Sequence, residues 1–449
     1  MNSKIRRHMI ATVTKRVLGL PFRKKVKDIW RLNQAESEAL QRDIFLKMLK
    51  HARTNVPYYL ANASSYPACE DTEHWRSFLQ SLPILSKGTL RDANEQFVSK
   101  KRPLGTTFHT TSGTTGTPLK LWVSPLERAF ADAIVFDWYR RIAHTKRYPP
   151  QISLSGFMTP SEDSSQLYWS AFGGRSIFLN MYALKEDHRD EICRILARYR
   201  KAMLYGYPSA LAELARVVGD SLRDVKDRFV AVTSAEVLRP QYRESIESNL
   251  CSRVYDQYGS QEGCHLALEC EAGNMHVHPL IGIVEILNGR DKPCNDGEMG
   301  RVIATGLLKR TMPLIRYELG DFVVAREGTC CCGLSWPLIG AIAGRDEDLV
   351  VTSDGRRVGH LDTVSTKHLN GIAESQLIQK AYDRFVYRIV MLPGARENSD
   401  LVASNERRIA EQLRRRLGYD LLVCFQYVDA IPREGGRSKF KAIVVEVEG

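Results

Sequence analysis

Hydroxyl side chains and glycines crowd into residues 110–120, and Lys120 closes the run. Glycines let backbone N–H groups approach a phosphate, hydroxyls add donors, and a lysine adds positive charge. The run is not a Walker loop, which needs Gly-Lys-Ser/Thr at the start of a helix. We therefore expect a phosphate-binding loop here, and a flexible surface loop is the alternative.

Two further segments carry side chains that suit a nucleotide. In residues 256–263, Tyr258 could stack on a base and Glu262 could hold Mg²⁺, because hard cations take oxygen ligands. In residues 313–321, Asp321 follows a glycine and suits the two hydroxyls of a ribose. By itself the first segment is a weak signal, and an ordinary strand and turn with a surface Asp is the better interpretation of the second when it stands alone.

Basic residues on glycine-containing loops occur twice more, at Gly344-Arg345 and in residues 435–441. Such a residue could reach an active site formed by the preceding segments. The alternative in both cases is a solvated charged loop.

The cysteines favour a metal site over disulfides. Cys270 and His276 form one pair and Cys330 and Cys332 a second, a composition that suits tetrahedral zinc. Three thiolates with one imidazole form a closed, structural site, so we assign it no chemistry. Reduced buried cysteines without a metal remain the alternative, and the competing ligands are Cys264, His265, His278 and Cys331.

Length and charge limit the class of protein. The 449 residues, 43% of them hydrophobic, favour two domains. The sequence shows neither a long apolar run nor a cleavable leader, so we expect a cytoplasmic protein. A net charge of +12 favours polyanionic partners such as nucleotide, coenzyme A, an acidic carrier protein, nucleic acid or an anionic membrane.

The first 32 residues form a basic extension with apolar residues interspersed. It could lie on a membrane surface, but we favour a solvated basic helix packed on the body through its apolar side.

The elements that must position these residues follow from hydrophobic periodicity. Helices are predicted at residues 33–52, 189–199 and 209–218, and the first is broken by Pro57. Short apolar runs at 152–154, 229–232 and 302–304 predict strands between helical stretches. This alternation is typical of an α/β body.

Together these segments resemble the adenylate-forming superfamily of acyl-CoA ligases, in particular the phenylacetate-CoA ligases and the capsular-polysaccharide adenylating proteins. The resemblance covers roughly residues 40–449. The motifs closest to that branch are residues 52–58, residues 205–209, Arg316-Tyr317 with Gly320-Asp321, and Cys-x-Cys-Gly ahead of Gly344.

The resemblance implies a role for each matching residue. The ATP phosphates would be held by Thr111, Ser112, Gly113, Thr114, Thr115, Gly116, Thr117 and Lys120. The adenosine would be framed by Ser234, Ala235, Glu236, Tyr258, Gly259, Ser260, Gln261 and Asp321. Catalysis would involve Glu262 with Mg²⁺, Arg345 and Lys439, and the acid pocket would include Phe157, Tyr205, Tyr207 and Pro208. Relatives in this branch also imply a structural zinc.

Two positions depart from the pattern. Gln261 stands where many relatives have Thr, and the last loop reads Arg-Ser-Lys where relatives have Gly-Lys, so Lys439 is chosen over Lys441 by spacing.

The resemblance implies an α/β fold with a large N-terminal domain, residues 1–344, and a small mobile α+β domain, residues 345–449. The implied activity is ATP-dependent formation of an acyl-AMP, followed by transfer to CoA. Transfer to an amine or a carrier protein is an alternative. A catalytically inactive nucleotide-binding or membrane-associated scaffold is another, whereas no nucleic-acid-binding module is present.

Overall fold

A computed structural model describes most of the chain. The described residues are 9, 12–14, 16–110, 119–154, 166–345, 350–352, 357–358, 371–417, 420–432 and 441–447.

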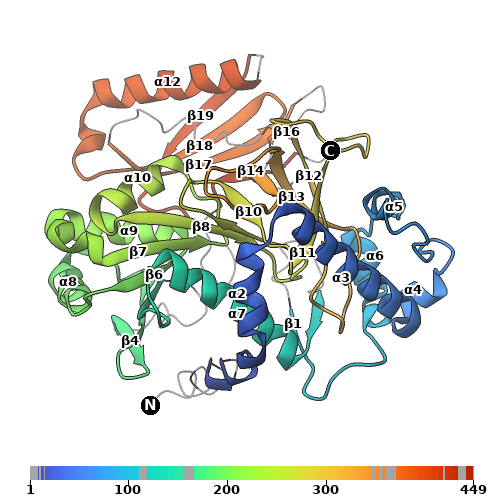
Figure 1. The fold of residues 1–449 in the computed structure, drawn as a ribbon. Coiled ribbons are helices and arrows are strands. Elements are labelled where there is room, and N and C mark those ends of the chain that lie inside the picture. Colours follow the sequence, from blue (N-terminus) through green and yellow to red (C-terminus); the bar gives the residue numbers. More distant parts are fainter. Residues whose placement is uncertain are drawn as a thin grey trace.

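Helices of the N-terminal region cover one end of the body (Figure 1). They are α2 (Arg23–Asp28), α3 (Gln34–Asn55), α4 (Pro57–Ala61), α5 (Trp75–Ser81) and α6 (Lys87–Asp92). The longest, α3, confirms the predicted helix and begins at a capping box, in which Asn33 and Glu36 each accept the other's backbone N–H. Pro57 holds Val56 in an extended conformation, so α3 ends there and α4 begins.

Within the described residues, one mixed sheet of twelve strands forms the body. Its hydrogen-bonded order is β11-β12-β13-β14-β10-β9-β8-β7-β6-β3-β5-β4. The strands are β3 (Gln151–Leu154), β4 (Tyr168–Ala171), β5 (Ser176–Leu179), β6 (Ala202–Gly206), β7 (Phe229–Ser234), β8 (Arg253–Gly259), β9 (Leu266–Glu269), β10 (Met275–Val277), β11 (Gly282–Leu287), β12 (Met299–Gly306), β13 (Tyr317–Ala325) and β14 (Leu338–Arg345).

One part of the sheet is parallel and the rest is antiparallel. Strands β5, β3, β6, β7 and β8 pair in parallel, and the strands from β8 to β11 pair antiparallel. Parallel strands need covering on both faces. Here α8 (Arg189–Ala197), α9 (Pro208–Val218) and α10 (Pro240–Asn249) contribute to one hydrophobic core, and α7 (Pro125–Ile142) with α2 contributes to another. The α/β prediction is confirmed.

A hairpin of β1 (Thr107–Thr110) and β2 (Lys120–Val123) precedes α7. Thr110 pairs with Lys120, so the two strands bracket residues 111–118. Those residues lie outside the described part of the chain.

The C-terminal region builds a separate sheet with the order β19-β18-β17-β20, covered by α12 (Ser399–Leu417) (Figure 1). Its strands are β17 (Ile372–Ala381), β18 (Arg384–Met391), β19 (Leu422–Tyr427) and β20 (Ile443–Val445), and a short pair, β15 (Val350–Val351) with β16 (Arg357–Val358), precedes them. Leu377, Tyr387 and Leu413 belong to its own hydrophobic core. The domain boundary expected between residues 344 and 345 falls at the end of β14 and stays a prediction.

Candidate functional site

The carboxyl ends of three parallel strands bring together segments that are distant in sequence. Tyr207 follows β6, Glu236 follows β7, and Glu262 follows β8. Because carboxyl ends of adjacent parallel strands meet at one edge of a sheet, these side chains share that edge, where open α/β sheets usually bind ligands. Gly206 permits the close approach of β6 to β3, since a Cβ there would lie 2.5 Å from the Leu154 carbonyl oxygen.

Tyr258 and Asp321 are in direct contact. The tyrosine hydroxyl donates a 2.8 Å hydrogen bond to Oδ2 of Asp321, and its ring centroid lies 4.5 Å from that of His265. In the antiparallel register of β13 and β14, Asp321 is the Cα partner of Arg345. Three residues that the sequence proposes for nucleotide binding are therefore neighbours.

The segment after β7 also contacts its neighbour. Glu236 Oε2 accepts a 3.3 Å hydrogen bond from the backbone N–H of Ser209, next to Pro208 in the first turn of α9. Ala235 has a φ of 71°, an uncommon conformation for a residue with a side chain. Burial raises the pKa of Tyr205, as does Tyr207, while a hydrogen bond with Ser234 opposes the shift. The adenine and acid-pocket candidates thus adjoin one another.

The turn after β8 holds two buried polar side chains that have few hydrogen-bond partners among the described residues. Glu262 is buried, and its Oε1 lies at the long distance of 3.5 Å from the Tyr317 hydroxyl. The Ser260 hydroxyl is buried and has no hydrogen-bond partner among the residues described. Because buried polar atoms are normally paired, these groups are suited to a ligand.

Lys309 is a functional candidate that sequence reasoning missed. Its Nζ donates to the backbone carbonyl oxygens of Glu262, at 2.7 Å, and Gln261, at 3.3 Å. Burial lowers the pKa of this lysine. A Cβ on Gly263, which has a φ of 67°, would lie 2.8 Å from Lys309 Cε, so glycine is needed where the lysine passes.

His109 links the same turn to the hairpin. Its Nε2 lies 3.2 Å from the Gln261 carbonyl oxygen, and Arg128 Nη2 lies 3.4 Å from its Nδ1. Burial, followed by the charge of Lys309, lowers the pKa of His109. No motif in the sequence marked these residues, although His109 directly precedes the hydroxyl-rich run.

The described side-chain contacts of Lys120 are with other residues than these. It is exposed, lies 3.8 Å from Glu95 in an ion pair, and is stacked over Phe108. The other predicted phosphate ligands, Thr111 to Thr117, lie outside the described residues, as do Phe157 and Lys439. The side chain of Arg345 is likewise not described.

Arg316 of the Arg-Tyr motif has a structural role. Its guanidinium forms a buried ion pair with Glu285 at 3.0 Å and donates a 2.6 Å hydrogen bond to the Gln80 carbonyl oxygen. Arg316 also has a φ of 49°. The residue anchors the start of β13 to the N-terminal helices, four residues ahead of Gly320.

A carboxyl group is buried beneath the site. Asp256, on β8, accepts a 2.7 Å hydrogen bond from Thr233, and its backbone N–H donates to Glu269 at 2.7 Å. Arg243 neutralises Glu269 at 2.8 Å. Burial, reinforced by the charge of Glu269, raises the pKa of Asp256 to about 7.

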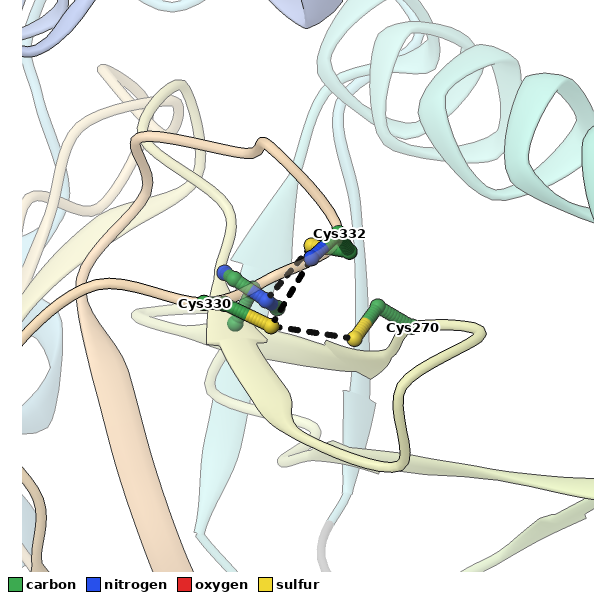
Figure 2. A group of neighbouring side chains, drawn as sticks. Cys270, Cys330 and Cys332 are labelled. Carbon is green, nitrogen blue, oxygen red and sulfur yellow. Dashed lines mark hydrogen bonds between the residues drawn. The ribbon is translucent and has the colours of Figure 1, made fainter.

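The four predicted zinc ligands converge, and Figure 2 shows the three cysteines among them. The ligand atoms of Cys270, His276, Cys330 and Cys332 all lie within 4.8 Å of one another. The Cys270 and Cys330 sulfurs are 3.7 Å apart, and Cys332 Sγ lies 3.4 Å from His276 Nε2. A tetrahedral zinc with bonds of about 2.3 Å separates two sulfurs by about 3.8 Å. The residues therefore fit zinc.

Surrounding groups orient these ligands. His276 Nδ1 lies 3.3 Å from the Trp336 carbonyl oxygen, which favours the proton on Nδ1 and leaves Nε2 facing the thiols. Asn274 and the backbone N–H of Cys332 donate to Cys330 Sγ. Burial opposes ionisation of Cys330, but these hydrogen bonds lower its pKa to about 6.

Comparison with known proteins finds related chains. Residues 350–446 match the family model of the CapK C-terminal domain. The chain is 22% identical to Protein CapK of Staphylococcus aureus over 375 residues, covering 81% of this chain and 79% of that protein. It is 24% identical to phenylacetate-coenzyme A ligase of Escherichia coli (strain K12) over 441 residues, covering 90% and 94%.

The fold is also known from solved structures. A 2-hydroxyisobutyryl-CoA ligase in the postadenylation state with R3-HIB-AMP superposes with a TM-score of 0.69 and 17% identity, covering 95% of this chain and 92% of that one. The chain therefore has the fold of the adenylate-forming ligases. Its relatives include CapK and a phenylacetate-coenzyme A ligase. The resemblance and the ligase class expected from the sequence are confirmed.

Proposed function

We propose that this protein activates a carboxylic acid with ATP to form an acyl-AMP and then transfers the acyl group to the thiol of CoA. The observation that carries the proposal is the Tyr258–Asp321 hydrogen bond at the same sheet edge as the buried Glu262. A carboxylate held beside an aromatic ring suits the ribose of a nucleotide. The phenylacetate-coenzyme A ligase relative supports the thiol as acceptor.

The proposed reaction has two steps. A carboxylate oxygen of the acid bonds to the α-phosphorus of ATP, and the bond from that phosphorus to the bridging oxygen breaks, which releases pyrophosphate. The thiol sulfur then bonds to the acyl carbon, the thiol proton leaves, and AMP departs. Positioning and stabilisation of negative charge are the protein's main contributions to such chemistry.

Each proposed residue has one task. Asp321 accepts hydrogen bonds from the ribose hydroxyls, while the Tyr258 hydroxyl holds the Asp321 carboxylate in place. Ser260 supplies the buried hydroxyl to a phosphate oxygen. Glu262 would hold Mg²⁺, whose charge, when bound, stabilises the phosphates. Lys439 and residues 111–117 are proposed for the phosphates from the sequence alone.

The acid is proposed to lie between the β6 end and the segment after β7. Tyr205, Tyr207 and Pro208 are the residues that we propose for this pocket, next to Glu236, which accepts a hydrogen bond from the backbone N–H of Ser209. The aromatic rings favour an aryl or apolar acid.

Two companion proposals concern the architecture. Residues 345–449 form a domain that reorients between the two steps, as its separate core allows. The Cys270, His276, Cys330 and Cys332 cluster binds one structural zinc, which we propose from its closed set of four ligands.

The acceptor of the acyl group has an alternative to CoA. Transfer to an amine or a carrier protein is the alternative expected from the sequence, and the chain's similarity to Protein CapK leaves the acceptor to be identified by experiment. A scaffold without catalysis is the remaining alternative.

The test is pyrophosphate release over a panel of aryl, fatty, hydroxy and amino acids with Mg²⁺, each with and without CoA. We expect acid-dependent release, with the matching acyl-CoA identified by mass spectrometry. Asp321→Asn should raise the KM for ATP, whereas the exposed control Asp220→Asn should not. Release with an acyl-AMP but no thioester would point to the amine or carrier acceptor. ATP binding without release for any acid would favour the scaffold.

A further inference from the structure

The basic N-terminal segment divides into a packed part and an exposed part. Val26 and Ile29 are each 1% exposed, and Phe22 stacks on Phe130, so this stretch packs on the body as expected. Ahead of it, Val17 and Leu20 remain 57% and 48% exposed, in line with Val13 at 52%. Residues 12–14 and 16–18 are helical, and Val13 and Val17 are four residues apart, so they share a helical face.

A basic cleft of about 340 Å³ lies beside these apolar residues. Its walls come from the N-terminal segment, from α7 and from the loop before β3. Six cations line it: Arg16, Arg23, Lys27, Arg140, Lys146 and Arg147. Arg16 is held in place over aromatic rings, 5.0 Å from the Tyr148 centroid and 5.8 Å from that of Phe136.

Among the described residues, cations outnumber carboxylates in the lining of this cleft. Asp137 is the one carboxylate in its lining, and it is already paired with Arg140 at 2.5 Å and Arg141 at 2.7 Å. In the ranges that the structure covers, no ion pair engages the remaining five cations of the lining. Mutual repulsion among uncompensated cations is relieved by an anionic partner.

We propose that this surface docks the protein on an anionic phospholipid membrane, with lipid phosphates in the cleft and Val13, Val17 and Leu20 in the headgroup region. Basic residues next to an exposed apolar stripe match the requirements of interfacial binding, where burial of apolar area adds to attraction by anionic lipids. The proposed contact is peripheral. No helix among the described residues is both long and apolar enough to cross a bilayer.

The docking surface leaves the candidate site accessible. Lys146 and Tyr148 precede β3, at the amino end of the parallel strands, whereas the site residues follow the carboxyl ends of β6, β7 and β8. Figure 1 shows the first coloured helical turns, which precede α2, on the side of the molecule away from the C-terminal sheet. A membrane-bound protein could therefore admit ATP and acid.

The experiment is flotation of the full-length protein with vesicles of phosphatidylcholine, with and without phosphatidylglycerol, at low and high salt. We expect binding to the anionic vesicles only, weakened by salt. The double variant Arg23→Gln/Lys27→Gln should lower partition about 30-fold, from about 1 kcal/mol per cation. The matched variant Arg407→Gln/Arg408→Gln, which removes the same charge from exposed positions on α12, should bind like the wild type.

Two further arms separate this proposal from its competitors. Val17→Ser/Leu20→Ser should weaken binding to the anionic vesicles without changing the charge of the protein. Unchanged binding would mean that only nonspecific electrostatic attraction acts, and would overturn the proposal. Titration with glycerol 3-phosphate tests whether the cleft binds a soluble phosphate ester. Saturable binding of that ester, lost in Arg23→Gln/Lys27→Gln and without vesicle binding, would contradict membrane docking. Equal flotation with neutral vesicles would also contradict it.

Discussion

The hydroxyl of Tyr258 on β8 donates a 2.8 Å hydrogen bond to Asp321 on β13, although three strands separate β8 from β13 in the sheet. In a flat sheet, four spacings of about 4.8 Å would place the strands about 19 Å apart. The sheet must curl strongly to bring the two residues together. Its curvature thus creates the contact that we assign to the ribose.

Removing the Tyr258 hydroxyl tests that contact. Tyr258→Phe keeps the ring beside His265 but loses the hydrogen bond that holds Asp321. A hydrogen bond to a charged group contributes about 1.5–3 kcal/mol, so we expect the KM for ATP to rise about tenfold or more with a smaller change in kcat. Steady-state kinetics with ATP varied measures this. An unchanged KM would remove Tyr258 from the proposed nucleotide site.

Lys309 should position the Glu262 turn without touching the substrate. Lys309→Met removes the donor to the Glu262 and Gln261 carbonyl oxygens. We expect the Mg²⁺ concentration for half-maximal activity to rise about tenfold, because the proposed metal ligand is less well held. Lys226→Met is the matched control, since Lys226 also donates to two consecutive backbone carbonyl oxygens, those of Glu247 and Ser248. Equal Mg²⁺ dependence in both variants would argue against positioning.

Asp256 should make stability decrease with pH. Its folded-state pKa of about 7 exceeds the unfolded value of about 3.9, so the folded protein retains the proton longer. The stabilisation is present below about pH 4 and is lost as the pH rises toward 7. The groups that face it are Thr233, Glu269 and Arg243.

Asp256→Asn imitates the protonated form and should remove this loss. We expect the melting temperature of the variant, relative to wild type, to be higher at pH 8 than at pH 5. Thermal melts across that range, with the exposed Asp220→Asn as control, provide the measurement. A difference that is independent of pH would show that Asp256 does not titrate there.

The Arg316–Glu285 pair should be essential for stability. Glu285→Gln leaves a buried guanidinium without its carboxylate, which costs about 3–5 kcal/mol. Urea unfolding measures the loss. Glu213→Gln, which breaks the exposed pair with Arg216, should cost less than about 1 kcal/mol. Similar losses in the two variants would contradict the distinction.

Zinc binding is tested by its ligands. We expect about one zinc per chain by elemental analysis, lost in Cys332→Ser together with at least about 5 °C in melting temperature. Cys331→Ser should retain the metal, because Cys331 is exposed and outside the cluster. If wild-type protein that is purified in zinc-containing buffer holds no bound zinc, the assignment is contradicted.

Local patterns in the sequence carried much of the fold. Helix α3 and strands β3, β7 and β12 occur at the predicted places because their periodicity and caps agree with their final burial. The Cys/His cluster was predictable because three thiols and one imidazole are the composition typical of a tetrahedral zinc site. The four candidate ligands span about 60 residues, and their side-chain chemistry alone was enough to group them.

Contacts that depend on sheet curvature could not be predicted. Lys309 lies 47 residues from Glu262, in a segment without a motif, so only the fold reveals that it holds the turn. The same applies to Glu285, the buried partner of Arg316. The division of the N-terminal segment at Phe22 was also missed, because apolar residues recur on both sides of it and the pattern does not show which are covered.

The most direct test of the central proposal is ATP–pyrophosphate exchange without any acceptor, because exchange requires reversible formation of an acyl-AMP. We expect exchange that depends on one class of acid and on Mg²⁺, and that falls at least about a hundredfold in Lys439→Ala. Exchange absent with every acid, in protein that still binds ATP, would contradict the account and leave a nucleotide-binding protein without this chemistry.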